Sequence, residues 1–176
     1  MGYTTEFWGE ASVSPPLNAA EVEYLNKFAG TRRMRRHSGA YTVEDNLPAL
    51  DPTDSWGDYL GQRHTVDVID YNNPPQGQPG LWCQWEVDSD GAFIRWNGSE
   101  KFYHATEWME YIICHFLRDG AYAGESRDPQ FADFTFDHVV NGIIEAQGED
   151  PDDRWRIEIF DNSVKTRQAK FVYEED

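Results

Sequence analysis

The stretch VVNGIIEAQGEDPDDRWRIEIFDNSVKTRQAKFVY, residues 139–173, decides the fold class. Its β-branched and aromatic residues predict three strands, at 139–147, 155–161 and 165–173. The two links, EDPDD and Asp-Asn-Ser, have the composition and the length of hairpin turns. Consecutive strands joined by hairpins pair antiparallel. This part of the chain therefore predicts an antiparallel sheet.

Two amphipathic helices are predicted upstream of these strands. Over residues 101–118 a broad apolar stripe repeats at helical spacing, and Gly120 is well placed to follow the last turn. The stripe consists of Ala105, Met109, Ile112, Ile113, Phe116 and Leu117. A shorter helix over 19–29 follows Asn18, and Glu21 stands three positions later, as in a capping box.

The remaining elements complete an α+β pattern. Residues 3–13 predict a first strand, and residues 81–87 and 92–96 predict a hairpin, because Asp90-Gly91 supplies the positive φ of such a turn. The chain order is then strand, helix, two strands, helix, three strands. We expect one α+β domain over 1–176, with a mainly antiparallel sheet of five to six strands covered by two helices. Residues 37–80 are predicted to form a long Gly/Pro-rich acidic loop.

Composition narrows the class of protein. The 176 residues include 32 acidic and 15 basic side chains, a formal charge of −17, and 15% are aromatic. Such an aromatic content is typical of a folded domain rather than a disordered acidic chain. The sequence contains no apolar stretch long enough for a membrane span and no signal-peptide pattern, so we expect a cytoplasmic protein without a membrane partner. The negative charge argues against general nucleic-acid binding.

Four motifs together resemble a known family. They are TRRMRR (31–36), GQPGLWCQW (77–85), EKFYHATEWMEYIICHF (100–116) and QGEDPDD (147–153). In this order they resemble a family of uncharacterised small acidic proteins of bacteria and of phages or prophages, over Tyr3 to about Val164. The resemblance implies a bacterial or phage cytoplasmic origin and brings no catalytic residues with it. One departure is Trp155, where the family pattern leads us to expect a small residue such as glycine and a tight turn.

The arginine cluster of TRRMRR is the first candidate site. Arg32, Arg33, Arg35 and Arg36 stand within five positions of an otherwise negative chain. Guanidinium groups offer forked donors to phosphate or carboxylate, so the cluster could hold an anionic ligand or an acidic partner segment. The alternative is that these arginines offset the dipole of the preceding helix and pair with the acidic stretch 37–94, which contains ten Asp and Glu residues and one Arg.

The segment from Asp70 to Trp85 is the second candidate site. Prolines stiffen it, glycines allow close approach of a ligand, and Trp82 and Trp85 offer flat apolar area. Because these two tryptophans are three positions apart on a predicted strand, they face opposite sides, so we expect one in the core and the other exposed. Asp67, Asp70 and Tyr71 would add acidic and aromatic contacts beside them. The alternative is a purely structural loop that enters the sheet.

Signals for catalysis or metal binding are weak. The acidic turn with Glu145, Glu149, Asp150, Asp152 and Asp153 lacks the spacing of a calcium loop. His104 with Glu107 is a single His-x-x-Glu, and Cys83 with His115 would need the fold to join them. The two cysteines predict neither a disulfide framework nor a metal site. No phosphate-binding loop, dinucleotide fingerprint, nucleophile elbow or zinc-protease motif is present. We therefore expect no metal and no cofactor.

Two functional hypotheses follow. In the first, an interaction protein binds a host or phage macromolecule through acidic and aromatic surface, and its partner is a protein with a basic surface. Dense carboxylates can imitate the charge of nucleic acid and raise the rate of association with such a partner. In the alternative, a small enzyme or ligand-binding domain takes a nucleotide-like or other anionic small molecule in the arginine cluster. A structural protein whose charge serves solubility is a third interpretation.

Overall fold

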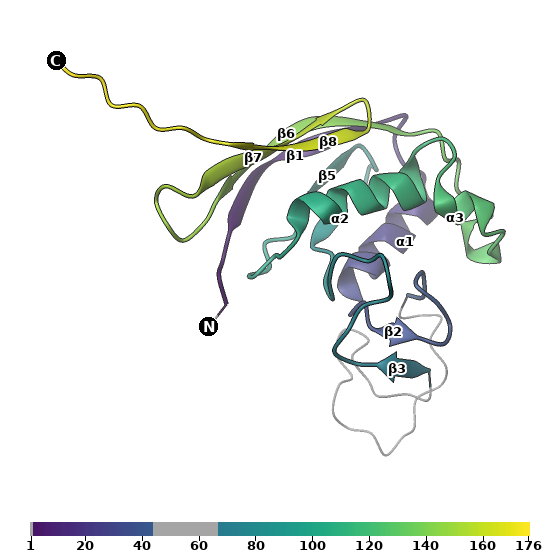
Figure 1. Cartoon of the computed structure of the whole chain (residues 1–176). Coiled ribbons are helices and arrows are strands. Elements are labelled where there is room, and N and C mark those ends of the chain that lie inside the picture. Colours follow the sequence, from purple (N-terminus) through teal and green to yellow (C-terminus); the bar gives the residue numbers. More distant parts are fainter. Residues whose placement is uncertain (1, 44–66) are drawn as a thin grey trace.

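The protein has an α+β fold, as the sequence predicts: a six-stranded antiparallel sheet with two helices packed on it (Figure 1). The computed structural model describes residues 2–43 and 67–176. Across the sheet the strands are β4 (Trp85–Val87), β5 (Phe93–Trp96), β1 (Glu6–Ser14), β6 (Val139–Gln147), β7 (Arg154–Phe160) and β8 (Ser163–Gln168). The two helices are α1 (Ala19–Gly30) and α2 (Ala105–Ile112).

Smaller elements lie around this frame. A π-helical turn over Ile113–Leu117 extends α2, and the short helix α3 (Tyr122–Glu125) and a 3₁₀ turn at Pro129–Phe131 follow it. The strands β2 (Arg35–Arg36) and β3 (Val68–Asp70) form a separate two-stranded sheet on the far side of the helices (Figure 1). Strand β2 ends immediately before the predicted 37–80 loop, whereas β3 lies inside it, so that part of the predicted loop is a strand. Residues 44–66 of the loop are outside the described part.

The first strand of the chain lies in the middle of the sheet. It pairs with β6 over nine residues, from Glu6 opposite Gln147 to Ser14 opposite Val139, and with β5 on its other side. The remaining neighbours, β4–β5, β6–β7 and β7–β8, are the three predicted hairpins. Gly91 closes the first of these with φ +69°, and a Cβ there would collide with the carbonyl of Leu17.

Both helix starts differ in detail from the sequence pattern. Asn18 caps α1, since its side-chain oxygen accepts a hydrogen bond from the Glu21 amide at 3.0 Å. The Glu21 carboxylate does not complete a capping box, because it turns inward to His138. Helix α2 begins at Ala105 rather than near 101, because Lys101 and His104 have φ values of +60° and +59°, which no α-helix contains.

The core lies between the helices and one face of the sheet. Phe7 of β1 is at the centre of an aromatic cluster, with the rings of Trp85, Trp96, Phe102 and Trp155 at 5.6 to 5.8 Å, all edge-on. Trp155 lies within β7, in the strand that follows the turn, so the tight turn of the family pattern is not formed at this residue.

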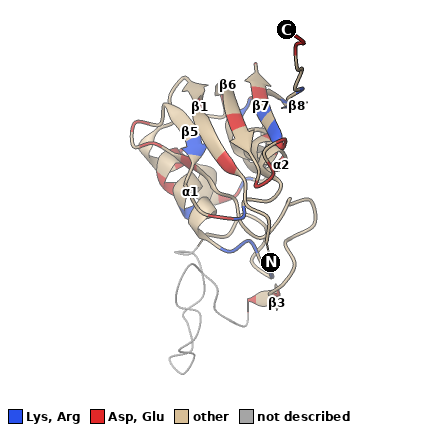
Figure 2. Cartoon of the chain, turned by 90° about the vertical axis from the view of Figure 1, so that its left-hand side faces the viewer, with Lys and Arg blue, Asp and Glu red and all other residues tan. Residues whose placement is uncertain are grey.

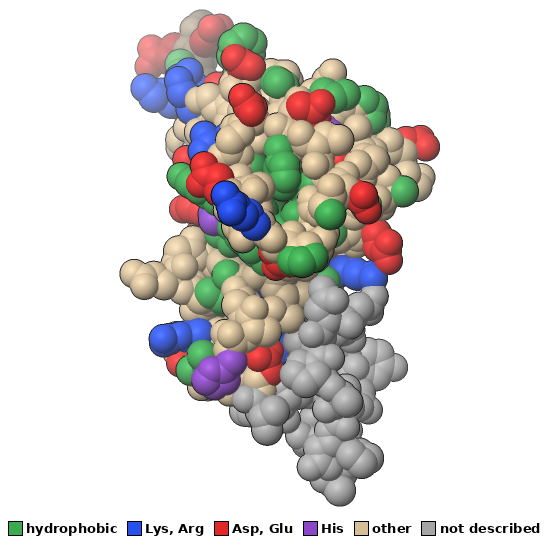
Figure 3. All heavy atoms as spheres, turned by 90° about the vertical axis from the view of Figure 1, so that its right-hand side faces the viewer, with side chains coloured by type: hydrophobic (Ala, Val, Ile, Leu, Met, Phe, Trp, Pro, Cys, Tyr) green, Lys and Arg blue, Asp and Glu red, His purple; other side chains and the backbone are tan. Residues whose placement is uncertain are grey.

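The other face of the sheet carries no helix, and we call it the uncovered face. Three large apolar side chains are exposed on it, namely Trp8, Ile143 and Phe160. Acidic and basic residues are interspersed over the sheet in Figure 2, and charges are likewise interspersed on the face seen in Figure 3. In neither view do the acidic side chains of the described residues form a single patch. No helix in the described ranges is long and apolar enough to cross a membrane.

Candidate functional site

The structure places two of the four clustered arginines inside the protein. The guanidinium of Arg33, 3% exposed, donates hydrogen bonds to the carbonyl oxygens of Thr42 at 2.8 Å and Ala40 at 2.7 Å. It also lies 4.0 Å from the centre of the Phe28 ring. Burial lowers the pKa of Arg33 to about 10. Arg33 therefore links helix α1 to the segment around residue 41 and does not reach the surface.

Arg36 and Asp67, both predicted binding residues, face each other in the interior. The Arg36 Nη1 and Asp67 Oδ2 atoms are 3.8 Å apart, and both side chains are buried. The Asp67 carboxylate also accepts hydrogen bonds from the amide and the hydroxyl of Ser38, at 2.8 and 2.6 Å. Burial lowers the pKa of Arg36, and the charge of Asp67 partly offsets that effect.

The same segment supports a loop through its backbone. The amide of Arg33 donates to the carbonyl of Leu81 at 2.8 Å, and the amide of Arg35 donates to that of Asn73 at 3.0 Å. The Arg32 guanidinium lies 4.3 Å from the centre of the Tyr71 ring. These contacts fix both ends of the loop 72–81, which belongs to the second candidate site.

The two tryptophans of that candidate have different environments. Trp85 is 2% exposed, packs edge-on against Phe7 and Phe102, and donates its indole N–H to the carbonyl of Ala105 at 2.8 Å. Trp82 is only partly buried and lines a surface pocket. Trp85 is thus a core residue, whereas Trp82 is available to a ligand.

This pocket, which we call the Trp82 pocket, has a volume of about 580 Å³. Its walls come from the loop 72–84 and from residues 100–104, which immediately precede helix α2. The apolar part of the lining is Pro74, Pro79, Leu81, Trp82 and Tyr103. The polar part is Asn72, Gln84, Glu100, Lys101 and His104, with the backbone of Gly80 between them. A pocket of this size and composition is typical of ligand sites.

Hydrogen bonds hold the two walls in position. Gln84 joins them, because its amide nitrogen donates to the carbonyl of Glu100 at 3.1 Å while its oxygen accepts from the Trp96 indole at 3.2 Å. Asp70 shapes the first wall by accepting from the amide of Asn72 and the side chain of Asn73, both at 2.9 Å. These bonds lower the pKa of Asp70. Asp70 therefore positions the loop.

The second wall has a strained backbone. Lys101 and His104 have left-handed φ values, which are uncommon for residues other than glycine and cost free energy. His104 precedes helix α2 without a side-chain cap. Behind it, a Cβ at Gly80 would lie 3.7 Å from both His104 Cδ2 and Trp108 Nε1, an ordinary van der Waals distance, so there is room for a small side chain at this position. Strain of this kind clusters at binding sites.

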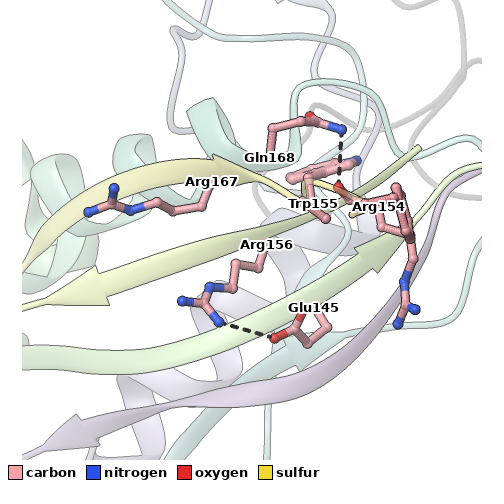
Figure 4. A pocket seen from close by; sticks show the side chains of 8 residues that line it. Glu145, Arg154, Trp155, Arg156, Arg167 and Gln168 are labelled. Atoms are coloured by element: carbon pink, nitrogen blue, oxygen red, sulfur yellow. Dashed lines mark hydrogen bonds and ion pairs between the residues drawn. The ribbon is translucent and has the colours of Figure 1, made fainter. Parts of the chain in front are cut away.

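A second hollow, of about 370 Å³, lies over β7 and β8 (Figure 4). It contains Arg154, Arg156 and Arg167, which the sequence analysis did not single out. Arg156 contacts Glu145 at 3.8 Å and Glu158 at 2.7 Å, and Arg167 contacts Glu158 at 3.0 Å. In Figure 4 the side chains of Arg154 and Arg167 point in different directions. An anion site requires guanidinium groups that converge on one point, and the guanidinium groups of Arg154, Arg156 and Arg167 do not.

The catalytic and metal candidates are engaged in other contacts. The Glu149 carboxylate accepts from the amide of Thr4 at 2.8 Å, and that of Asp153 accepts from the Tyr3 hydroxyl at 2.7 Å. Burial raises the pKa of Cys83 to about 12. His115 hydrogen-bonds the Tyr41 hydroxyl at 2.6 Å. Within the described ranges, no group of three His, Cys, Asp or Glu side chains could hold a metal ion.

Sequence reasoning missed the second wall of the Trp82 pocket. Tyr103 and His104 were assigned to a helix, and only the non-helical backbone before Ala105 brings them beside Trp82. The one available signal was the pair of aromatic residues in EKFYH, outside the apolar stripe of the helix. No protein-family model, curated protein or solved structure matches the chain.

Proposed function

We propose that the protein is a cytoplasmic interaction protein of bacterial or phage origin, and that it binds another protein by accepting one of its apolar side chains in the Trp82 pocket. One observation carries this proposal: Trp82, Tyr103 and two prolines line a pocket of about 580 Å³ at the surface. Aromatic side chains give a large contact area at a small cost in conformational entropy, which is why they dominate binding surfaces.

The stiffness of the pocket supports binding of a defined partner. Pro74 and Pro79 restrict the first wall, and its ends are tied to the arginine segment through Leu81 and Asn73. Gln84 joins this wall to the second. A site that keeps its shape loses little entropy on binding, so more of the contact energy contributes to affinity.

Charge supports a partner with a basic surface. The net charge of −17 attracts such a partner over a distance of about one Debye length, which raises the association rate at low ionic strength. Glu100, which lines the pocket, and Asp70, which accepts a hydrogen bond from the lining residue Asn72, place negative charge at this site. The apolar pocket would then supply most of the affinity, and the surface charge the rate.

The test is capture from a bacterial lysate with the immobilised protein, identification of the captured proteins, and titration of each purified candidate by calorimetry. We expect Trp82→Ala and Tyr103→Ala each to weaken binding at least about tenfold, or about 1.4 kcal/mol. The matched control is Trp8→Ala, because Trp8 is 50% exposed on the uncovered face of the sheet, outside the pocket.

Salt and charge variants complete the experiment. Affinity should fall as ionic strength rises, and Glu100→Lys should slow association while leaving the melting temperature nearly unchanged. Asp67 is unsuitable for charge reversal, because its carboxylate is buried beside Arg36. If Trp82→Ala and Trp8→Ala bind every captured protein as tightly as the unaltered chain, the pocket is not the interaction site.

A further inference from the structure

Strand β8 is an edge of the large sheet, and half of its backbone groups face away from the protein. The amide of Ala169 donates to the carbonyl of Arg154 at 2.9 Å, which sets the alternation along the strand: residues 163, 165, 167 and 169 bond to β7. Val164, Thr166 and Gln168 therefore direct their N–H and C=O groups outward. In the described residues no strand pairs with this edge.

The β-forming sequence continues beyond the last residue of β8. The pattern predicts extended structure as far as Tyr173, but pairing ends at Ala169, because β7 begins at Arg154 and offers no further partner. Residues 170–176 run out past the sheet (Figure 1). Phe171, Val172 and Tyr173 are 48%, 83% and 90% exposed there. Three consecutive β-forming residues thus extend the open edge of the sheet beyond its last pair, and natural sheets usually protect such edges.

The charges along this segment are self-complementary. Lys165, Arg167 and Lys170 make the first part basic, and Glu174, Glu175 and Asp176 make the last part acidic. An antiparallel pair of two such segments sets the basic part of each against the acidic part of the other. A parallel pair would set like charges side by side, which is unfavourable. The segment therefore fits a second copy of itself in one orientation.

We infer that β8 and residues 169–176 pair antiparallel with the same segment of a second copy, so that the two six-stranded sheets become one continuous sheet. In the register that we assign, Phe171 lies on the two-fold axis opposite Phe171 of the second copy. Arg167 then faces Glu175 of the second copy on the uncovered face. The outward backbone groups of Thr166, Gln168 and Lys170 gain hydrogen-bond partners, as in other edge-strand additions.

This pairing is separate from the Trp82 pocket. The residues that form it lie after position 163, and none of them lines that pocket. On the covered face, the Thr166 hydroxyl contacts the Thr106 hydroxyl of α2 at 2.9 Å. This contact involves only side chains, so the backbone edge of β8 stays open. The dimer would present two Trp82 pockets, and a partner with two binding segments would then bind with avidity.

A charge-swap experiment tests the inference. One variant carries Lys165→Glu and Arg167→Glu, and the other carries Glu174→Lys and Glu175→Lys. Mass is measured by light scattering after size exclusion at high micromolar protein and low salt. We expect the unaltered chain at twice its 20.4 kDa mass, and each variant alone as a monomer. An equimolar mixture of the two variants should restore the dimer, because in the mixed pair the contact between positions 167 and 175 keeps its native signs at one end of the paired segment and is re-formed with reversed signs at the other.

Controls make each outcome decisive. Glu107→Lys with Glu110→Lys changes the net charge by the same amount as Glu174→Lys with Glu175→Lys, but on the exposed side of α2, and should leave the dimer intact. Far-UV circular dichroism of every variant establishes that it is folded. The inference is overturned if the unaltered chain is a monomer, if the two charge variants dimerise as well as the control, or if folded variants fail to dimerise when mixed.

Discussion

The imidazole of His138 and the carboxylate of Glu21, 117 positions apart in the chain, form a hydrogen-bonded ion pair inside the protein. Both side chains are 1% exposed. The second ring nitrogen of His138, Nδ1, donates to the carbonyl of Pro15 at 2.6 Å. Glu21 lies in the first turn of α1, and His138 immediately precedes β6, so this pair fastens the helix to the sheet. Burial alone would lower the pKa of His138, but the hydrogen bonds to Glu21 and Pro15 outweigh it, and the pKa is raised.

The first prediction concerns the pH dependence of this pair. A histidine whose pKa is higher in the folded than in the unfolded state contributes stability below its unfolded pKa, near 6.5, and loses it as pH rises through the folded pKa. We expect His138→Gln to lower the free energy of unfolding by about 3 kcal/mol at pH 6, because it leaves the Glu21 carboxylate buried without a cation. Urea unfolding at pH 6 and pH 9 should show this loss shrinking at the higher pH. A loss that grows with pH would contradict the ion pair.

His115 should behave in the opposite way. Burial, with a smaller contribution from Arg118, lowers the pKa of His115 to about 4. The ring is stacked on Tyr111 with centroids 3.8 Å apart. The unfolded chain therefore binds the proton first, and stability falls as pH drops from 6.5 toward 4. We expect a loss on the order of 2 kcal/mol that His115→Gln removes. NMR of the imidazole checks it directly: a ring that titrates near pH 6.5 would refute the prediction.

The third prediction separates Arg33 from its neighbours. Arg33→Met should cost about 3 kcal/mol, because it removes the guanidinium donor to the buried carbonyl of Thr42 and one of the two donors to the carbonyl of Ala40, which keeps the Gln78 amide. Arg33→Lys should rescue little, since an ammonium cannot contact both carbonyls and also stack on Phe28. Arg35→Met is the control, with an exposed side chain and an expected change within about 0.5 kcal/mol. Urea midpoints measure all three, and equal losses for Arg33→Met and Arg35→Met would show that Arg33 is not a buried anchor.

The fourth prediction concerns the two thiols. The pKa of Cys83 is about 12, so at pH 8 only about one molecule in 10⁴ carries the thiolate there. Cys114 is partly exposed, and burial raises its pKa as well. We expect iodoacetamide to modify Cys114 slowly and Cys83 only after the protein is unfolded in urea. Mass mapping of the labelled peptides gives the order, and labelling of Cys83 in the folded protein would contradict its burial.

Much of the local structure follows from short stretches of sequence. The hairpin at Gly91, the turn between β7 and β8 and the cap at Asn18 were all predicted, because each depends on residues a few positions apart. The same locality explains the α+β class, since hairpins and amphipathic helices each have a characteristic hydrophobic period. The end of β8 shows the limit: its sequence suits a strand to Tyr173, but a strand exists only where a neighbour pairs with it.

The candidate site depended on distant contacts. The sequence predicted that Trp82 and Trp85 face opposite sides, but only the packing of Phe7 and Phe102 decides that Trp85 is the buried one. TRRMRR has the composition of an anion clamp, yet Arg33 is enclosed because the segment around residue 41 folds over it.

What the sequence determined by itself is therefore the six strands and two helices of the main fold, their chain order and the turns between neighbours. Only the tertiary structure decided that β1 lies between β5 and β6, that Glu21 meets His138 and that residues 100–104 form a wall of the Trp82 pocket. The physical reason is that hydrogen-bond periodicity and turn chemistry act within a few residues. Contacts between distant segments depend instead on how whole faces pack to exclude water, which no short stretch encodes.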